Sequence, residues 1–137
     1  MADPTRFDRS AVTALLLVVD LAIIIAQLSY GLVVHGTDPL AVPLYTAETV
    51  APFLLGWLLV APVLGVYSAR VRGSLVETTL AVGIAWIVAA LIGVGLRATP
   101  WLVGDAPLAF VLVTVGTGLA TLLPWRLAVS VLARTRS

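Results

Sequence analysis

One acidic residue, Asp20, lies inside an apolar run, residues 11–34, that is long enough to cross a membrane. An ionised carboxylate at that depth costs about 2.5 to 3.5 kcal/mol on insertion scales, so it marks a functional site with a partner to be found. Thr13 and Gln27 lie on the same arc of a helix as Asp20, because seven residues advance almost two turns. This polar stripe predicts either a proton or cation site or a hydrogen-bonded tie between helices.

Arg126 is the basic residue that matches Asp20 in depth. At 1.5 Å per residue, Asp20 lies about 13 Å from the start of the first run, and Arg126 lies about 10 Å from the end of the fourth run. These two helix ends are expected on the same side of the membrane, so the two residues lie at similar depth. We therefore predict an Asp20–Arg126 pair that neutralises both charges. The alternative is that Arg126 extends to the lipid headgroups, with Trp125 at the membrane interface.

Four apolar runs must position these residues. The chain has 137 residues, of which 61% are hydrophobic and 11% charged, and its mean hydropathy is +1.11, as expected for a protein embedded in a bilayer. The runs cover residues 11–34, 49–68, 74–96 and 106–133, and each reaches or approaches the ~20 residues that a spanning helix needs. We predict an all-α, polytopic membrane protein in which residues 1–137 form one antiparallel four-helix bundle.

Arginine gathers on one side of this four-helix path. The residues on that side are Arg6, Arg9, Arg70, Arg72, Arg134 and Arg136. Cytoplasmic loops retain positive charge, so both termini are predicted to be cytoplasmic, an N-in/C-in arrangement.

The opposite side of the path carries a mixed group of charges. It contains His35, Glu48, Arg97 and Asp105. These residues predict a cluster at the outer face, either as a structural rim of surface ion pairs or as an electrostatic latch. His35 at a helix end is either a polar cap or a group that senses pH.

Small residues recur every four positions in the third and fourth runs. They are Ala81, Ala85, Ala89 and Gly93 in the third run, and Gly116, Ala120, Pro124 and Ala128 in the fourth. Small residues at this spacing let helix backbones approach closely in lipid, so both stripes predict helix packing within the bundle or in a dimer. The alternative interpretation is a substrate groove.

Several classes of function find no support in the residues. The eight basic residues are all Arg and are scattered, so no nucleic acid is expected as a partner. The sequence has no Cys and one His, and it contains neither a metal-ligand cluster nor a nucleophile with its base. We therefore expect no enzyme activity, no metal and no cofactor.

Several residues together carry a family resemblance. They include Asp20, Gly31, His35 and the pair Trp125–Arg126, and the most specific part is the run Pro-Phe-Leu-Leu-Gly-Trp at residues 52–57. This pattern resembles a prokaryotic membrane family catalogued as domain of unknown function 3054, from the first helix to the fourth. The resemblance implies a four-helix protein of the prokaryotic cytoplasmic membrane, and it implies no particular activity.

Two functions remain open on the sequence. In the first, the chain is a dimeric proton- or cation-coupled transporter or channel centred on Asp20. In the second, it is a non-catalytic accessory or scaffold subunit that packs against itself or against another membrane protein. Lipid is the expected surroundings in both cases.

Overall fold

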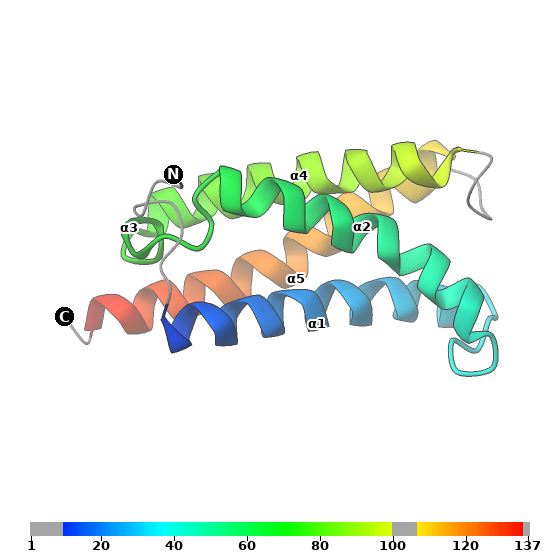
Figure 1. Cartoon of the computed structure of the whole chain (residues 1–137), viewed down its shortest axis with the longest axis horizontal. Helices are drawn as coiled ribbons and strands as arrows, with labels where there is room; N and C mark the ends of the chain where they lie inside the picture. The colour runs from blue at the N-terminus through cyan, green and yellow to red at the C-terminus, as the bar shows by residue number, and fades with distance from the viewer. Residues whose placement is uncertain (1–9, 100–106, 136–137) are drawn as a thin grey trace.

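The computed structural model describes residues 10–99 and 107–135, and the chain is all-α over that range (Figure 1). Five helices follow in order: α1 (Ala11–Val34), α2 (Pro43–Val63), α3 (Ala69–Arg72), α4 (Leu75–Arg97) and α5 (Leu108–Thr135). The four long helices, α1, α2, α4 and α5, are each long and apolar enough to cross a membrane. They pack together, so the chain is a multi-pass membrane protein with four candidate spans.

The ends of the helices follow from local side chains. Ser10 and Ser74 precede α1 and α4, and their side-chain oxygens accept hydrogen bonds from the backbone amides of Thr13 and Glu77. Gly65, with φ at 75°, follows the last turn of α2, and its missing Cβ allows this left-handed conformation.

The second helix differs most from the sequence prediction. It begins at Pro43 rather than at residue 49, because proline fits the first turn, where the missing amide would have no partner. It ends at Val63 rather than at residue 68, because the chain turns at Gly65 and Ser68 then caps the short helix α3. The other described bounds agree with the prediction to within two residues, and residue 106 lies outside the described ranges.

The long helices run alternately in opposite directions. The start of α1, the end of α5 and the whole of α3 lie together at one end of the bundle, on the left of Figure 1. The connection between α1 and α2 lies at the other end, together with the start of α5. We call these the α3 end and the opposite end.

Close packing of α2 against α4 forms one half of the core. A Cβ on Gly56 of α2 would come within 2.6 Å of the Ala89 carbonyl oxygen of α4. The two backbones therefore approach so closely that only glycine fits at position 56. Ala85 and Ala89 of the predicted stripe are fully buried, Gly93 is buried against the Phe53 ring, and Ala81 is half-buried. The third-run stripe therefore packs within the bundle.

The fourth-run stripe, in contrast, does not face the bundle, so packing within the bundle is wrong for this stripe and packing in a dimer stays a prediction. Gly116 and Ala120 are exposed, together with Pro124 and Ala128 further along α5. The buried positions of α5 form a different row, two residues out of step: Thr114, Gly118, Leu122, Arg126 and Ser130. Gly118 is the glycine that matters for packing, because the Trp86 indole of α4 lies directly against it.

Candidate functional site

Asp20 and Arg126 form a buried ion pair between α1 and α5. Arg126 Nη1 donates to Asp20 Oδ2 across 2.9 Å, and the side chains of Arg126 and Asp20 are 1% and 0% exposed. Asp20 lies nine positions after Ala11, and Arg126 lies nine positions before Thr135, so both lie about 14 Å from the α3 end. The structure thus brings together the two residues that depth alone had paired, and Arg126 does not extend to the headgroup level.

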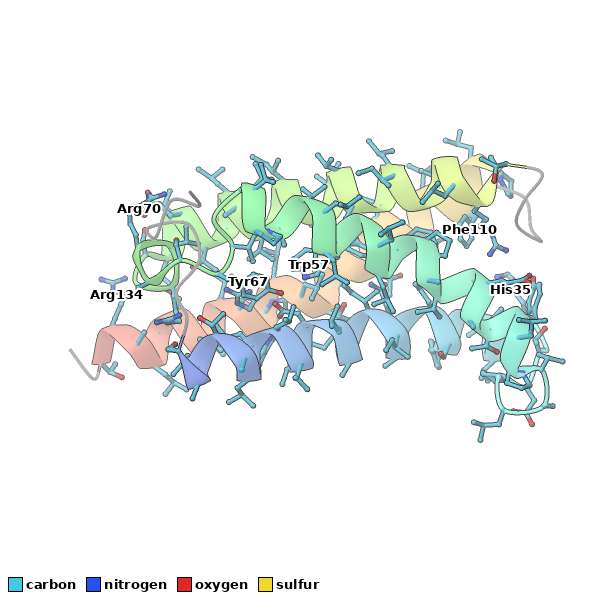
Figure 2. The ribbon with its side chains drawn as sticks, viewed as in Figure 1. His35, Trp57, Tyr67, Arg70, Phe110 and Arg134 are labelled. Atoms are coloured by element: carbon cyan, nitrogen blue, oxygen red, sulfur yellow. The ribbon has the colours of Figure 1, made fainter. Side chains whose placement is uncertain are left out.

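Tyr67 adds a hydroxyl to this pair from the connection between α2 and α3. Its hydroxyl donates to Asp20 Oδ2 over 2.7 Å and accepts a hydrogen bond from Trp57 Nε1 over 2.8 Å. The Tyr67 hydroxyl therefore links Trp57 to the Asp20 carboxylate. Figure 2 shows Trp57 and Tyr67 in the interior of the bundle.

Two further contacts complete the hydrogen bonding of the ion pair. Trp125 Nε1 donates to Asp20 Oδ1 over 3.0 Å, so both carboxylate oxygens are engaged. Arg126 Nη2 donates to the Val66 carbonyl oxygen over 2.7 Å, and the guanidinium carbon lies 5.4 Å from the centroid of the Tyr67 ring. We call Asp20, Trp57, Tyr67, Trp125 and Arg126 the Asp20 network.

The backbone that supplies Tyr67 is buried but not helical. Between Val63 and Ala69 the chain is not helical, yet Val66, Tyr67 and Ser68 are at most 1% exposed. Non-helical backbone at membrane depth requires internal hydrogen-bond partners. Arg126 supplies one to the Val66 carbonyl, and Ser68 supplies another by donating to the Gly65 carbonyl.

The geometry defines what the Asp20 network can do chemically. Three donors occupy the carboxylate and no side chain of the ion pair reaches solvent, so the arrangement holds α1, α5 and the α2–α3 connection together. A proton added to Asp20 would remove the charge that holds Arg126. Within residues 10–99 and 107–135, no group of three or more His, Asp or Glu side chains is placed to hold a metal ion.

Thr13 and Gln27 share the buried face of α1 with Asp20 but do not join its hydrogen bonds. Thr13 lies at the first turn, where its hydroxyl accepts a hydrogen bond from the Ser10 side chain. Gln27 is 8% exposed, and its Nε2 has no hydrogen-bond partner among the described residues. The predicted stripe is therefore a shared face of α1 and not one connected polar site.

The predicted outer-face cluster is only partly described. His35 caps the C-terminal end of α1 and is exposed at the opposite end of the bundle, as Figure 2 shows, and Glu48 is half-buried on α2. Arg97 is buried rather than placed at the surface, and its guanidinium carbon lies 4.7 Å from the centroid of the Phe110 ring. Asp105 lies outside the described residues.

Sequence reasoning missed three members of the Asp20 network. It placed Tyr67 at the end of a helix, where its hydroxyl had no assigned role, and it treated Trp125 as a marker of the membrane interface. Trp57 entered only as the last residue of the run at residues 52–57. The signal that could have identified Tyr67 is Gly65, because a glycine just after a proline-containing turn indicates a break in the helix. Nothing in the sequence around Trp125 indicates that its side chain contacts Asp20.

Comparison with known proteins identifies a family for this chain. No curated protein and no solved structure matches the chain. The family described as protein of unknown function (DUF3054) matches residues 17–129, a range that contains every member of the Asp20 network. That range covers most of the chain, and the chain therefore belongs to the DUF3054 family.

Proposed function

We propose that this protein is a non-catalytic accessory or scaffold subunit of a complex in the cytoplasmic membrane of a prokaryote. The observation that carries the proposal is the completeness of the Asp20 network. Asp20 accepts hydrogen bonds from Tyr67, Trp125 and Arg126, so an incoming cation would have to displace a guanidinium and two neutral donors. A carboxylate held in this way is suited to fixing helices in place.

The orientation belongs to the same proposal, with both termini in the cytoplasm. Arg70 and Arg72 belong to α3, and Arg134 lies at the same end of the bundle in Figure 2, which supports placing the α3 end on the cytoplasmic side. Fusing a reporter that is active only in the cytoplasm to each terminus tests this point. Activity at both termini is expected, and activity at neither would reverse the orientation.

The partner is either a second copy of the chain or another membrane protein. One face of α5 is exposed and carries Leu112, Gly116 and Ala120. A helix face with small residues accommodates another helix in lipid. The size of the complex solubilised from the membrane, with its protein composition, distinguishes the two partners.

A charge-free variant tests the scaffold proposal directly. Asp20→Asn combined with Arg126→Gln removes both charges and keeps hydrogen-bonding groups at both positions. If the network only fixes the bundle, this variant should assemble into the same complex as the wild type. Loss of assembly in a variant that is still folded would contradict the proposal.

Proton- or cation-coupled transport is the second candidate, and one observation favours it. The buried, non-helical segment from Gly65 to Ser68 lies beside an ion pair that one proton would break, and transporters place their sites at such breaks in helices. The test is proton release when Na⁺, K⁺ or tetraphenylphosphonium is added to the purified protein. A signal that disappears in Asp20→Asn would favour transport over the scaffold, and no Asp20-dependent signal is expected from a scaffold.

A further inference from the structure

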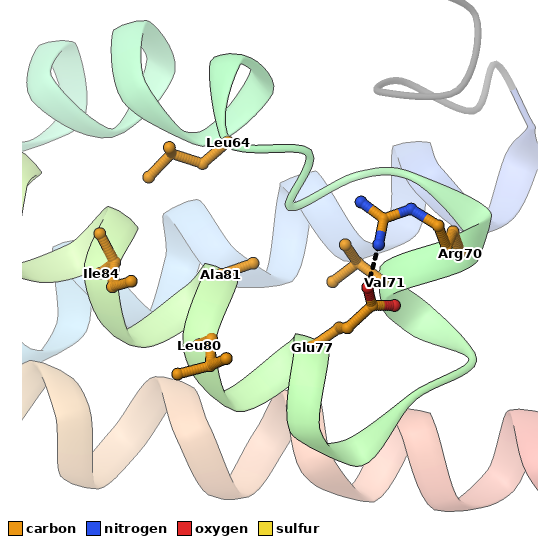
Figure 3. Close-up of a pocket in the computed structure, with 7 residues that line it drawn as sticks. All are labelled: Leu64, Arg70, Val71, Glu77, Leu80, Ala81 and Ile84. Carbon is orange, nitrogen blue, oxygen red and sulfur yellow. Dashed lines mark hydrogen bonds and ion pairs between the residues drawn. The ribbon is translucent and has the colours of Figure 1, made fainter.

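A shallow pocket lies on the surface of the bundle at the α3 end, between the end of α2, the helix α3 and the first turns of α4 (Figure 3). Its volume is about 250 Å³. The residues that form its walls and rim include Leu64, Arg70, Glu77, Leu80, Ala81 and Ile84. The pocket is separate from the Asp20 network, since none of these residues belongs to it.

The pocket has an apolar wall that runs along the direction of the helices. Leu80 and Ile84 of α4 are 56% and 49% exposed, and Leu64 lies across from Ile84 in Figure 3. From Glu77 to Ile84 the wall rises about 10 Å along α4, at 1.5 Å per residue. In a spanning helix this direction leads from the headgroup level into the hydrocarbon, so the wall fits part of one acyl chain.

The rim of the pocket carries one positive and one negative side chain. Arg70 of α3 donates a hydrogen bond to the Glu77 carboxylate, and the two side chains are 64% and 40% exposed. An exposed ion pair of this kind contributes little to stability. Arg70 can therefore exchange the Glu77 carboxylate for an anionic group of a ligand, and Glu77 can exchange Arg70 for a cationic group. The rim therefore offers a guanidinium and a carboxylate side by side.

We propose that the pocket binds phosphatidylethanolamine from the surrounding bilayer. Its phosphate would accept hydrogen bonds from Arg70, whose planar fork matches phosphate oxygens, and its primary ammonium would donate to Glu77. One acyl chain lies against Leu80 and Ile84. An anionic phosphatidylglycerol leaves Glu77 without a cation, and the quaternary ammonium of phosphatidylcholine has no N–H to donate.

Native mass spectrometry of the full-length, delipidated protein in a neutral detergent tests this site. Three lipids with identical acyl chains are titrated separately: phosphatidylethanolamine, phosphatidylglycerol and phosphatidylcholine. The wild type should bind phosphatidylethanolamine about five-fold more tightly than either of the others, the scale set by one exposed charge contact. Equal affinity for all three lipids would overturn the proposal, and this comparison needs no substitution.

Single substitutions then assign the two charges. Arg70→Gln should lower the affinity for phosphatidylethanolamine by about five-fold, and Glu77→Gln should do the same while raising the affinity for phosphatidylglycerol. Arg134→Gln is the matched control, because Arg134 is an exposed arginine at the same end and outside the pocket. If Arg70→Gln and Glu77→Gln both kept the full preference for phosphatidylethanolamine, the two side chains would not recognise the headgroup and the proposal would be wrong.

Discussion

Arg126 Nη1 lies 2.9 Å from Asp20 Oδ2, although 106 positions separate the two residues in the chain. The contact joins the first long helix to the last, and α1 packs only against α2 and α5 among the described helices. The ion pair therefore holds α1 in a bundle whose other half, α2 with α4, is fixed by close backbone packing. Three experiments follow from this arrangement.

The first concerns the ion pair itself. Asp20→Asn leaves Arg126 as a buried cation without a counter-charge, and Arg126→Gln leaves Asp20 as a buried anion, so each single variant should lose about 3 to 5 kcal/mol of stability. The double variant should lose much less than the sum of the two. Unfolding in detergent, followed by near-ultraviolet circular dichroism of the tryptophans, measures all three. Additive losses would show that the two residues act independently.

The second concerns the hydroxyl of Tyr67. Tyr67→Phe keeps the ring near the Arg126 guanidinium but leaves Trp57 Nε1 without its acceptor, so stability should fall by about 1 to 3 kcal/mol. Tyr30→Phe is the control, because Tyr30 is 66% exposed on α1 and should change stability by less than about 0.5 kcal/mol. Equal effects of the two substitutions would contradict the role of Tyr67 in the network.

The third compares two glycines in the same helix. A Cβ on Gly118 would overlap the Trp86 indole, which also donates to the Val115 carbonyl over 3.1 Å, so Gly118→Ala should cost about 1 to 3 kcal/mol. Gly116 has open space around the same position, and Gly116→Ala should stabilise α5 by up to about 1 kcal/mol. Thermal unfolding of both variants measures the difference, and the reverse order would mean that α5 presents its other face to the bundle.

Much of the architecture is readable without a structure, for a physical reason. Hydrocarbon imposes a minimum length on a spanning helix, so apolar runs of that length show that there are four long helices and give the described bounds of α1, α4 and α5 to within two residues. The same rule gives the depth of each residue in the membrane, and the similar depths of Asp20 and Arg126 predicted that the two residues form a pair. The rule fails at both ends of α2, because the helix already begins at Pro43 rather than at residue 49, and the short apolar run through Val66 does not continue it beyond Val63.

The sequence by itself determined the number of long helices, the depth of the two buried charges and the packing face of α4. Only the tertiary structure decided which face of α5 is buried, since small residues occur on both faces and periodicity does not distinguish them. It also decided that Tyr67 and Trp125 meet Asp20. Those contacts depend on the turn at Gly65 and on the rotation of α5 about its axis, which are set by packing between helices and not by any single segment.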